Sequence, residues 1–301
     1  MCIRDRNKLR DLRRQFLKFS TLITPISNFI ATTQSIVDAP NTPINSILLG
    51  ADHMDRSVWA ASKVSINNDY YSIKLVKQLK EEKHKLILNL GRWEPGCYKN
   101  SEAIFNLINE VKKEALSVII LILADPDHIK IRPEFKNYVI PIGFPDDKEL
   151  QEIMGQVDLG ISVSLWEGFN LPLAEMQWLN KPVLVFNIGA HPEVVFHPWY
   201  LCETLNEMSE KTIAILEEND IPLEIREESF QNFQSAFRWE KFIKFYHEIF
   251  KKITQPTAIN IIVDVTNATK DSANSGVIRV TRRLCRELQN YTCLLYTSRC
   301  V

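Results

Sequence analysis

The sequence has no surplus of charge of either sign: its 301 residues carry a formal net charge of −1, and the pI is near 6.6. We therefore expect no nucleic-acid partner. No apolar run is long enough to cross a bilayer, and the Arg/Lys-rich start lacks the apolar centre of a signal peptide. These absences favour a cytoplasmic protein, with peripheral association at the inner face of the membrane as an alternative.

Several cofactor and metal signatures are also missing. The six cysteines are scattered and form no C-x-x-C pair, which disfavours a disulfide scaffold or a zinc site. The absence of G-x-G-x-x-G disfavours a dinucleotide-dependent dehydrogenase, and there is no P-loop. We expect neither a cofactor nor a bound metal.

Both ends of the chain look foreign to the rest. Residues 1–6 read MCIRDR and residues 293–298 read CLLYTS. DNA encoding the first has a reverse complement that encodes Cys-Leu-Leu-Tyr-Thr, so the two ends are consistent with one element in opposite orientations. That element resembles the transposon end used to prepare sequencing libraries. We therefore leave residues 1–6 and 293–301 out of fold reasoning and treat the remainder as truncated at both ends.

Strand-length apolar segments alternate with helical patterns through the middle of the chain. We expect strands at 22–26, 44–49, 85–90, 116–124, 138–142, 157–165 and 182–186. We expect a helix at 7–19 and another that Ser27 caps and that runs through Phe29 and Ile36. Further helices are expected at 70–82, 101–114, 146–156 with Asp146 as its cap, 171–179, 208–219 and 237–253. This alternation predicts an α/β domain with a Rossmann-like parallel sheet flanked by helices.

The strongest chemical signal is the segment Glu167–Glu175, EGFNLPLAE, which follows one expected strand and opens an expected helix. Unpaired backbone N–H groups and the positive end of the helix dipole would face a phosphate there. Glu167 lies in the loop and Glu175 in the helix, so the two carboxylates flank the helix start and suit sugar hydroxyls. Ligands of α/β sheets bind beyond the carboxyl ends of the strands, where this segment lies.

This segment resembles the E-x7-E signature of the retaining glycosyltransferases of family 4, the group 1 glycosyltransferases. Other segments resemble motifs of the same family in the same order. They are Ile47–Asp52, Gly91-Arg92 with Lys99-Asn100, Gly143-Phe144 with the acids after it, and Ala190–Val194. The match runs from about Leu22 to Ile253. It implies the GT-B fold, of which this chain contains the C-terminal, donor-binding half.

The resemblance assigns roles to single residues. Arg92 and Lys99 match the basic pair that neutralises the donor diphosphate, a task that suits a guanidinium fork and a point charge. Glu167 matches the glutamate near the donor sugar, and these three are the expected catalytic residues. The expected donor-binding residues are Gly91, Phe169, Asn170, Leu171 and Glu175, the last of which holds the ribose. Asn170 stands where the family usually has Gly, and Asn tolerates a left-handed backbone.

The same resemblance divides the chain. Residues 7–30 are the expected tail of an N-terminal acceptor domain with its connection, and residues 31–253 the nucleotide-sugar-binding domain. Residues 254–258 form a linker, and 259–292 begin a second glycosyltransferase-like domain, with an expected strand at 259–265 and an expected helix at about 277–288. The last expectation rests on Asp264–Thr266 and Ser275–Val280, which resemble the opening strand and glycine loop of such a domain.

The implied reaction is transfer of a hexosyl-type sugar from a nucleotide-sugar donor to a saccharide or lipid-linked acceptor, with retention, in polysaccharide biosynthesis. Because the acceptor domain is nearly absent, this fragment should bind nucleotide without turning over. Three alternatives stay open: a non-catalytic sugar-nucleotide-binding domain, a sugar-nucleotide epimerase of the same fold, and a scaffold. Of the histidines, we expect His191 to be structural and His53 to be a bystander.

Overall fold

A computed structural model describes most of the chain. It covers residues 11, 14, 15, 17, 19–55, 70–114, 116–218, 221, 225, 230 and 233–253, with the backbone of 261–264 and 294–297. Within this part a six-stranded parallel sheet dominates. Its strands are β1 Lys85–Arg92, β2 Val118–Leu123, β3 Val139–Pro141, β4 Leu159–Ser162, β5 Val183–Phe186 and β6 Leu201–Cys202. The expected Rossmann-like parallel sheet is therefore confirmed.

The strand order is β3-β2-β1-β4-β5-β6, and every neighbouring pair is parallel. The chain builds outward from β1 to β3, then crosses back to β4 on the other side of β1 and builds outward again. The order thus reverses between β1 and β4. In open α/β sheets, the crevice beyond the carboxyl ends of two such strands is where ligands bind.

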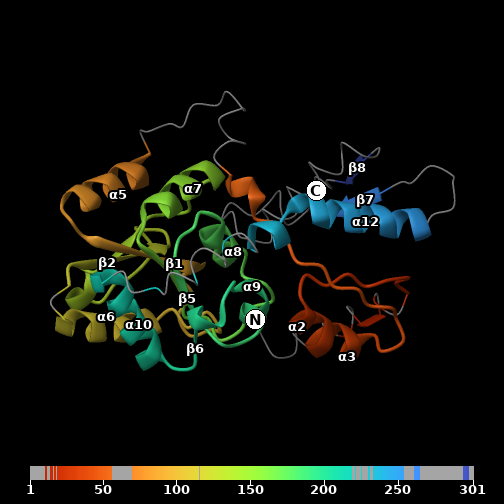
Figure 1. Cartoon of the computed structure of the whole chain (residues 1–301), viewed down its shortest axis with the longest axis horizontal. Helices are drawn as coiled ribbons and strands as arrows, with labels where there is room; N and C mark the ends of the chain where they lie inside the picture. The colour runs from red at the N-terminus through yellow and green to blue at the C-terminus, as the bar shows by residue number, and fades with distance from the viewer. Residues whose placement is uncertain are drawn as a thin grey trace.

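Helices cover both faces of the sheet (Figure 1). α5 Tyr71–Glu81, α7 Asp147–Gln156 and α8 Leu171–Trp178 lie on one face, and α6 Ala103–Val111 and α10 Leu205–Glu218 on the other. Right-handed crossovers explain this, because α6 and α8 connect strands in opposite directions along the sheet. β4 and β5 are buried at every position, as expected for strands covered on both faces.

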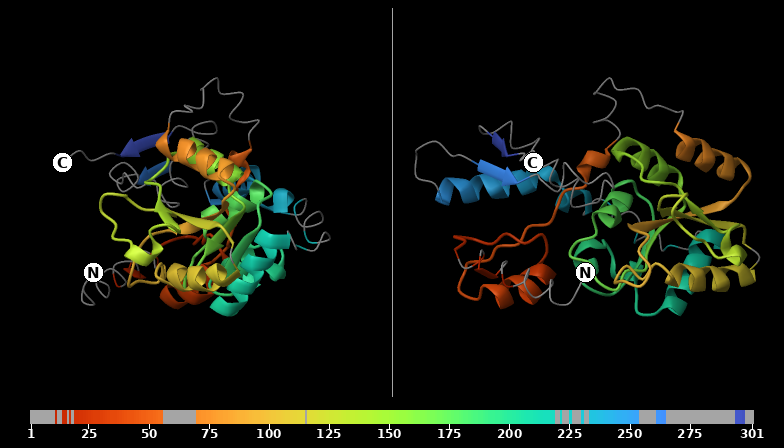
Figure 2. Two further views of the ribbon diagram at one scale, coloured as in Figure 1. Left: turned by 90° about the vertical axis from the view of Figure 1, so that its left-hand side faces the viewer. Right: turned by 180° about the vertical axis from the view of Figure 1, so that it is seen from behind.

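A second region lies to one side of the sheet domain and combines distant parts of the chain (Figures 1 and 2). A helical stretch comprises α2 Asn28–Ile30, η1 Ala31–Ser35 and α3 Ile36–Asp38, and a short turn η2 covers Asp52–Met54. The closing helix α12, Trp239–Ile253, belongs to this region. A hydrogen bond between the Thr24 and Tyr246 hydroxyls, 2.7 Å apart, connects the N-terminal part of this region to α12.

Two expected strands, 22–26 and 44–49, are wrong. The structure has only an isolated parallel bridge between Ile23 and Ile44. The carbonyl groups of Pro43 and Pro25 accept hydrogen bonds from the amides of Ile23 and Ile47. Proline has no N–H group to donate in return, so the two segments do not form a continuous ladder. The helix expected at 208–219 instead begins at Leu205, and the closing helix begins at Trp239 rather than Phe237.

Other expectations hold or remain untested. Ser27 caps α2 through its hydroxyl, and Asp146 caps α7, both as expected. β7 Ile261–Asp264 falls within the strand expected there and pairs in parallel with β8 Leu294–Thr297, inside the segment set aside as foreign. The linker 254–258, the expected helix at 277–288 and the rest of 259–292 lie outside the described residues. No described helix is long and apolar enough to span a membrane.

Candidate functional site

Two loops meet where the strand order reverses. The loop after β1 carries Lys99, and the loop after β4 carries Glu167. Lys99 Nζ lies 2.6 Å from Glu167 Oε1, and the side chains are only 13% and 10% exposed. The Leu165 amide also donates to the Tyr98 carbonyl at 2.7 Å. The structure therefore brings together two of the three expected catalytic residues, since the carboxyl ends of adjacent parallel strands share one edge.

The third expected catalytic residue, Arg92, ends β1 and lies closer to solvent. Its guanidinium contacts Glu94 Oε1 at 3.2 Å, with side chains 41% and 37% exposed. Gly91 lies against Lys99: a Cβ added there would be 3.9 Å from Lys99 Cδ. Both expected cations are thus paired with carboxylates here, so a diphosphate would have to compete with Glu94 and Glu167 for them.

The start of α8 has the backbone conformation expected from its sequence. Asn170 is left-handed, with φ 69° and ψ 71°, and precedes the first helical residue, Leu171. Pro172 occupies the first turn, where its missing N–H costs no helical hydrogen bond. Phe169 and Leu171 are buried, which fixes this turn against the core.

The loop after β5 braces this turn from the other side. Gly189 is left-handed, with φ 57°, and a Cβ there would lie 2.6 Å from the Glu167 carbonyl oxygen. The Ala190 amide donates to that same carbonyl at 2.9 Å. His191 opens α9, His191–Val194, and its Nε2 lies 3.0 Å from the Asn170 side-chain amide. His191, expected to be structural, is completely buried.

The second region is also tied to this site. Ser27 donates to the Gly168 carbonyl at 2.6 Å. The Glu193 carboxylate accepts the amides of Asn28 and Phe29, each at 2.7 Å, and so caps α2 from α9. Neither Ser27 nor Glu193 was expected to make this contact. No local pattern could have found it, because Ser27 and Gly168 are 141 residues apart in sequence.

Glu175 lies within α8 and is completely buried. Its Oε1 lies 2.9 Å from His53 Nε2, and the Trp239 indole N–H donates to His53 Nδ1 at 2.9 Å. An indole nitrogen only donates, so His53 Nδ1 is the acceptor and Nε2 carries the proton shared with Glu175. His53, expected to be a bystander, is thus a hydrogen-bond partner of Glu175. A ribose contact by Glu175 requires movement of the groups that cover it.

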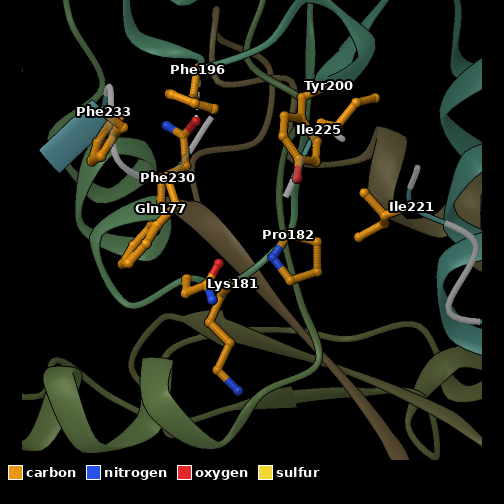
Figure 3. A pocket seen from close by; sticks show the side chains of 10 residues that line it. Gln177, Lys181, Pro182, Phe196, Tyr200, Ile221, Ile225, Phe230 and Phe233 are labelled. Atoms are coloured by element: carbon orange, nitrogen blue, oxygen red, sulfur yellow. Dashed lines mark hydrogen bonds between the residues drawn. The ribbon is translucent and has the colours of Figure 1, made fainter. Parts of the chain in front are cut away.

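A separate cavity of about 30 Å³ lies at the far end of α8 (Figure 3). Its lining includes Gln177, Lys181, Pro182, Phe196 and Phe233. Pro182 precedes β5, so the cavity is at the amino ends of the strands, away from Lys99 and Glu167. This volume is far below the roughly 300 Å³ at which small-molecule pockets begin. Among the described residues, no group of three or more His, Cys, Asp or Glu could hold a metal ion.

The six-stranded parallel sheet with helices on both faces matches the α/β fold of solved glycosyltransferases that have the GT-B architecture. Residues 84–218, which contain β1 to α10, match the family model of glycosyl transferases group 1. This match covers the loops of Lys99 and Glu167 and the whole of α8.

Three solved structures are similar in fold. Sucrose-phosphate synthase from Thermosynechococcus elongatus has 13% identity and a TM-score of 0.62, covering 82% of this chain and 62% of that one. Anabaena HepE in complex with UDP and glucose has 17% identity and a TM-score of 0.62, covering 81% and 66%. A UDP-forming α,α-trehalose-phosphate synthase from Burkholderia xenovorans has 14% identity and a TM-score of 0.58, covering 80% and 62%. At these identities the likeness concerns the fold alone.

A relative is also found by sequence. Over 184 residues the chain is 27% identical to the "Uncharacterized 41.2 kDa protein in cps region" of Klebsiella pneumoniae. The aligned part is 60% of this chain and 50% of that protein. The chain therefore spans about half the length of this curated relative.

Proposed function

We propose that the sheet domain is the donor-binding half of a glycosyltransferase that takes a sugar from a nucleotide-sugar donor and retains the anomeric configuration. The observation that carries this proposal is the meeting of Lys99 and Glu167, 2.6 Å apart, where the strand order reverses and α8 begins. The family match of residues 84–218 supports it. The UDP bound in the Anabaena neighbour makes UDP-sugars the first donors to test.

In this proposal the donor diphosphate lies between the two loops. Arg92 and Lys99 approach it from the β1 side, and the amides of residues 169–171 approach it from the start of α8. During transfer, the bond from the anomeric carbon to the diphosphate oxygen breaks and its electron pair stays on that oxygen, while the oxygen of an acceptor hydroxyl bonds to the anomeric carbon and the hydroxyl proton passes to the departing diphosphate. The two cations stabilise this developing charge. When phosphate also pairs with Lys99, the Glu167 carboxylate can accept a hydrogen bond from a hydroxyl group of the donor sugar.

The ribose site is the part of the proposal that needs rearrangement. Glu175 is proposed to bind the ribose hydroxyls, yet its carboxylate is buried and hydrogen-bonded to His53. Donor binding must therefore move η2, which carries His53, or turn the Glu175 side chain. A donor-induced shift in the signals of His53 would accompany this step.

The proposal extends to the whole protein. The acceptor would be a saccharide or a lipid-linked saccharide, and the process polysaccharide biosynthesis, in keeping with the cps region named for the Klebsiella relative. A second glycosyltransferase module would begin at residue 259, and the work would take place in the cytoplasm or at the inner face of the membrane. The present chain alone would bind donor without transferring the sugar.

Calorimetry of the full chain with UDP and UDP-sugars tests donor binding. Lys99→Ala should weaken UDP binding by about tenfold or more, because it removes a charge-assisted contact worth about 1.5–3 kcal/mol. Lys136→Ala is the matched control, since Lys136 is exposed and remote from the loops. Equal UDP affinity in the two variants contradicts the proposed role of Lys99.

A chemical probe built into the site gives an independent reading. Cys97 is an exposed free thiol two residues before Lys99. Bound UDP should slow its alkylation, which mass spectrometry of the peptide can follow. Unchanged alkylation at saturating UDP places the nucleotide elsewhere. Release of an epimerised sugar without any acceptor identifies an epimerase, and absence of nucleotide binding identifies a scaffold.

A further inference from the structure

In the turn before α8, Asn170 has an unfavourable backbone conformation. Its φ of 69° places a non-glycine residue in the left-handed region, which L side chains disfavour. The residue is nevertheless only 7% exposed and opens the helix whose amides face the proposed diphosphate site. Asn in this region is stabilised when its short polar side chain makes a defined hydrogen bond, so the partner of that side chain decides how firmly the turn is held.

That partner is His191, which is completely buried. Its Nδ1 lies 2.8 Å from the carbonyl oxygen of Phe186, the last residue of β5. A carbonyl only accepts, so Nδ1 carries the proton, and Nε2 must use its lone pair towards Asn170. The Asn170 amide nitrogen, 3.0 Å away, is the donor. Burial also lowers the pKa of His191, which keeps the ring neutral as this arrangement needs.

The two hydrogen bonds form a chain from the sheet to the turn. Phe186 is fixed by β5, which pairs with both β4 and β6. His191 is hydrogen-bonded both to Phe186 and to Asn170, which lies 21 residues earlier in the sequence. The position of Asn170 is thereby tied to that of β5. We propose that His191 is a positioning residue for the donor site, which holds Asn170 left-handed so that the amides of residues 169–171 point together at the diphosphate.

The inference rests on the proposed function for its ligand, but not for its geometry. His191 does not touch the donor in this arrangement, since both ring nitrogens are occupied by Phe186 and Asn170. Its effect passes through Asn170 alone. Replacing Asn170 with Gly should therefore make the turn independent of His191, because Gly adopts a positive φ without a side-chain anchor.

A double-mutant cycle on the full chain tests this dependence. His191→Ala should weaken UDP binding by about tenfold, a coupling of the size seen when one anchoring contact is lost. In the Asn170→Gly background, the same His191→Ala change should alter the UDP affinity by less than about twofold. His191→Gln should restore most of the affinity, because its amide can donate to Phe186 and its oxygen can accept from Asn170. An equal loss in both backgrounds overturns the proposal.

His128→Ala is the matched control, because the His128 side chain is 84% exposed and its Nδ1 pairs with the neighbouring Asp125 at 2.6 Å. It should leave UDP affinity and melting temperature unchanged. If His191→Ala does not fold, the comparison of His191→Gln with the wild type still decides the matter. A His191→Gln protein that folds but binds UDP tenfold more weakly contradicts a role based on these two hydrogen bonds.

NMR separates this inference from the proposed function. Isotope-labelled ring nitrogens of His191 should show the proton on Nδ1, and the Asn170 amide coupling should report a positive φ that His191→Ala removes. Both readings need no nucleotide. A chain that shows them but binds no UDP keeps the positioning role and loses the donor site. A proton on Nε2 instead overturns the positioning role whether or not UDP binds.

Discussion

The two loops that form the candidate site differ in how they are held. Residues 95–98 of the loop after β1 are exposed, and this loop is fixed mainly by local contacts such as the Glu94 amide to the Ser101 hydroxyl, 2.8 Å. The loop after β4 is mostly buried, and distant residues hold it: Ser27, Ala190 and His191 all bond to it. One side of the site is adaptable and carries the cations. The other is rigid and carries the helix start.

This difference suggests a division of work. A rigid helix start can present its amides in one fixed direction, which favours preorganised anion binding. Arg92, whose ion pair with Glu94 is exposed, can exchange this carboxylate for phosphate at small cost, because surface ion pairs contribute little. Substitutions on the β4 side should therefore cost stability, and substitutions on the β1 side should change affinity.

Two glycines with positive φ give the sharpest contrast. Gly189→Ala should destabilise the protein by roughly 2–5 kcal/mol, from about 1–2 for a left-handed alanine and about 1–3 for overpacking against Glu167. Gly96→Ala, in the loop after β1, has φ 71° but nothing within 4 Å of its added Cβ. It should cost only the conformational part. Thermal unfolding measures both, and equal shifts in melting temperature would remove the distinction between the loops.

Substitution of Glu193 should give the next largest loss of stability. Glu193→Gln should cost about 1–2 kcal/mol, because it removes the charge from a cap that accepts two amides of α2 at 2.7 Å. Denaturant unfolding measures the loss. Glu134→Gln is the control, since the Glu134 side chain is 58% exposed and its ion-pair distance to Arg132 is 4.0 Å. A loss no larger than in the control would show that the two regions are not joined at this point.

Acid should loosen the rigid side first. Burial lowers the pKa of His191 from its usual 6.5, against the opposing effect of Glu167 and with the help of Lys99. The unfolded chain then binds more protons than the folded one below about pH 6.5. The contribution of His191 to stability is therefore complete above that pH and falls as pH drops below it. His191→Gln should flatten this part of the stability curve, and an unchanged slope contradicts the assignment.

The smallest expected effect lies on the adaptable side. Glu94→Gln should strengthen UDP binding about twofold to threefold, because it frees Arg92 from an exposed ion pair worth up to about 1 kcal/mol. Stability should hardly change. Glu110→Gln, which removes the partner of Lys113 elsewhere, is the control. Weaker UDP binding in Glu94→Gln would mean that Glu94 orients Arg92 for the ligand rather than competing for it.

Much of the architecture could be predicted without coordinates. The strands of the sheet are short apolar runs with turn residues around them, and their alternation with helices leaves few topologies. Even the left-handed Asn170 follows from its residue type and place. The prediction failed at 22–26 and 44–49, where apolar content indicated strands but Pro25 and Pro43 prevent a continuous ladder.

The sequence by itself determined five of the six strands of the sheet, β1 to β5, the helix that opens at Leu171, and the edge at which Lys99 and Glu167 lie. All of these follow from local periodicity and strand direction, whereas the two-residue strand β6 is too short to show a pattern. Only the tertiary structure decided which side chains hold them. His53 and Glu175 are 122 residues apart in sequence, and Glu193 and Phe29 are 164 apart. Such contacts depend on how packed elements converge in space, and no spacing along the chain encodes them.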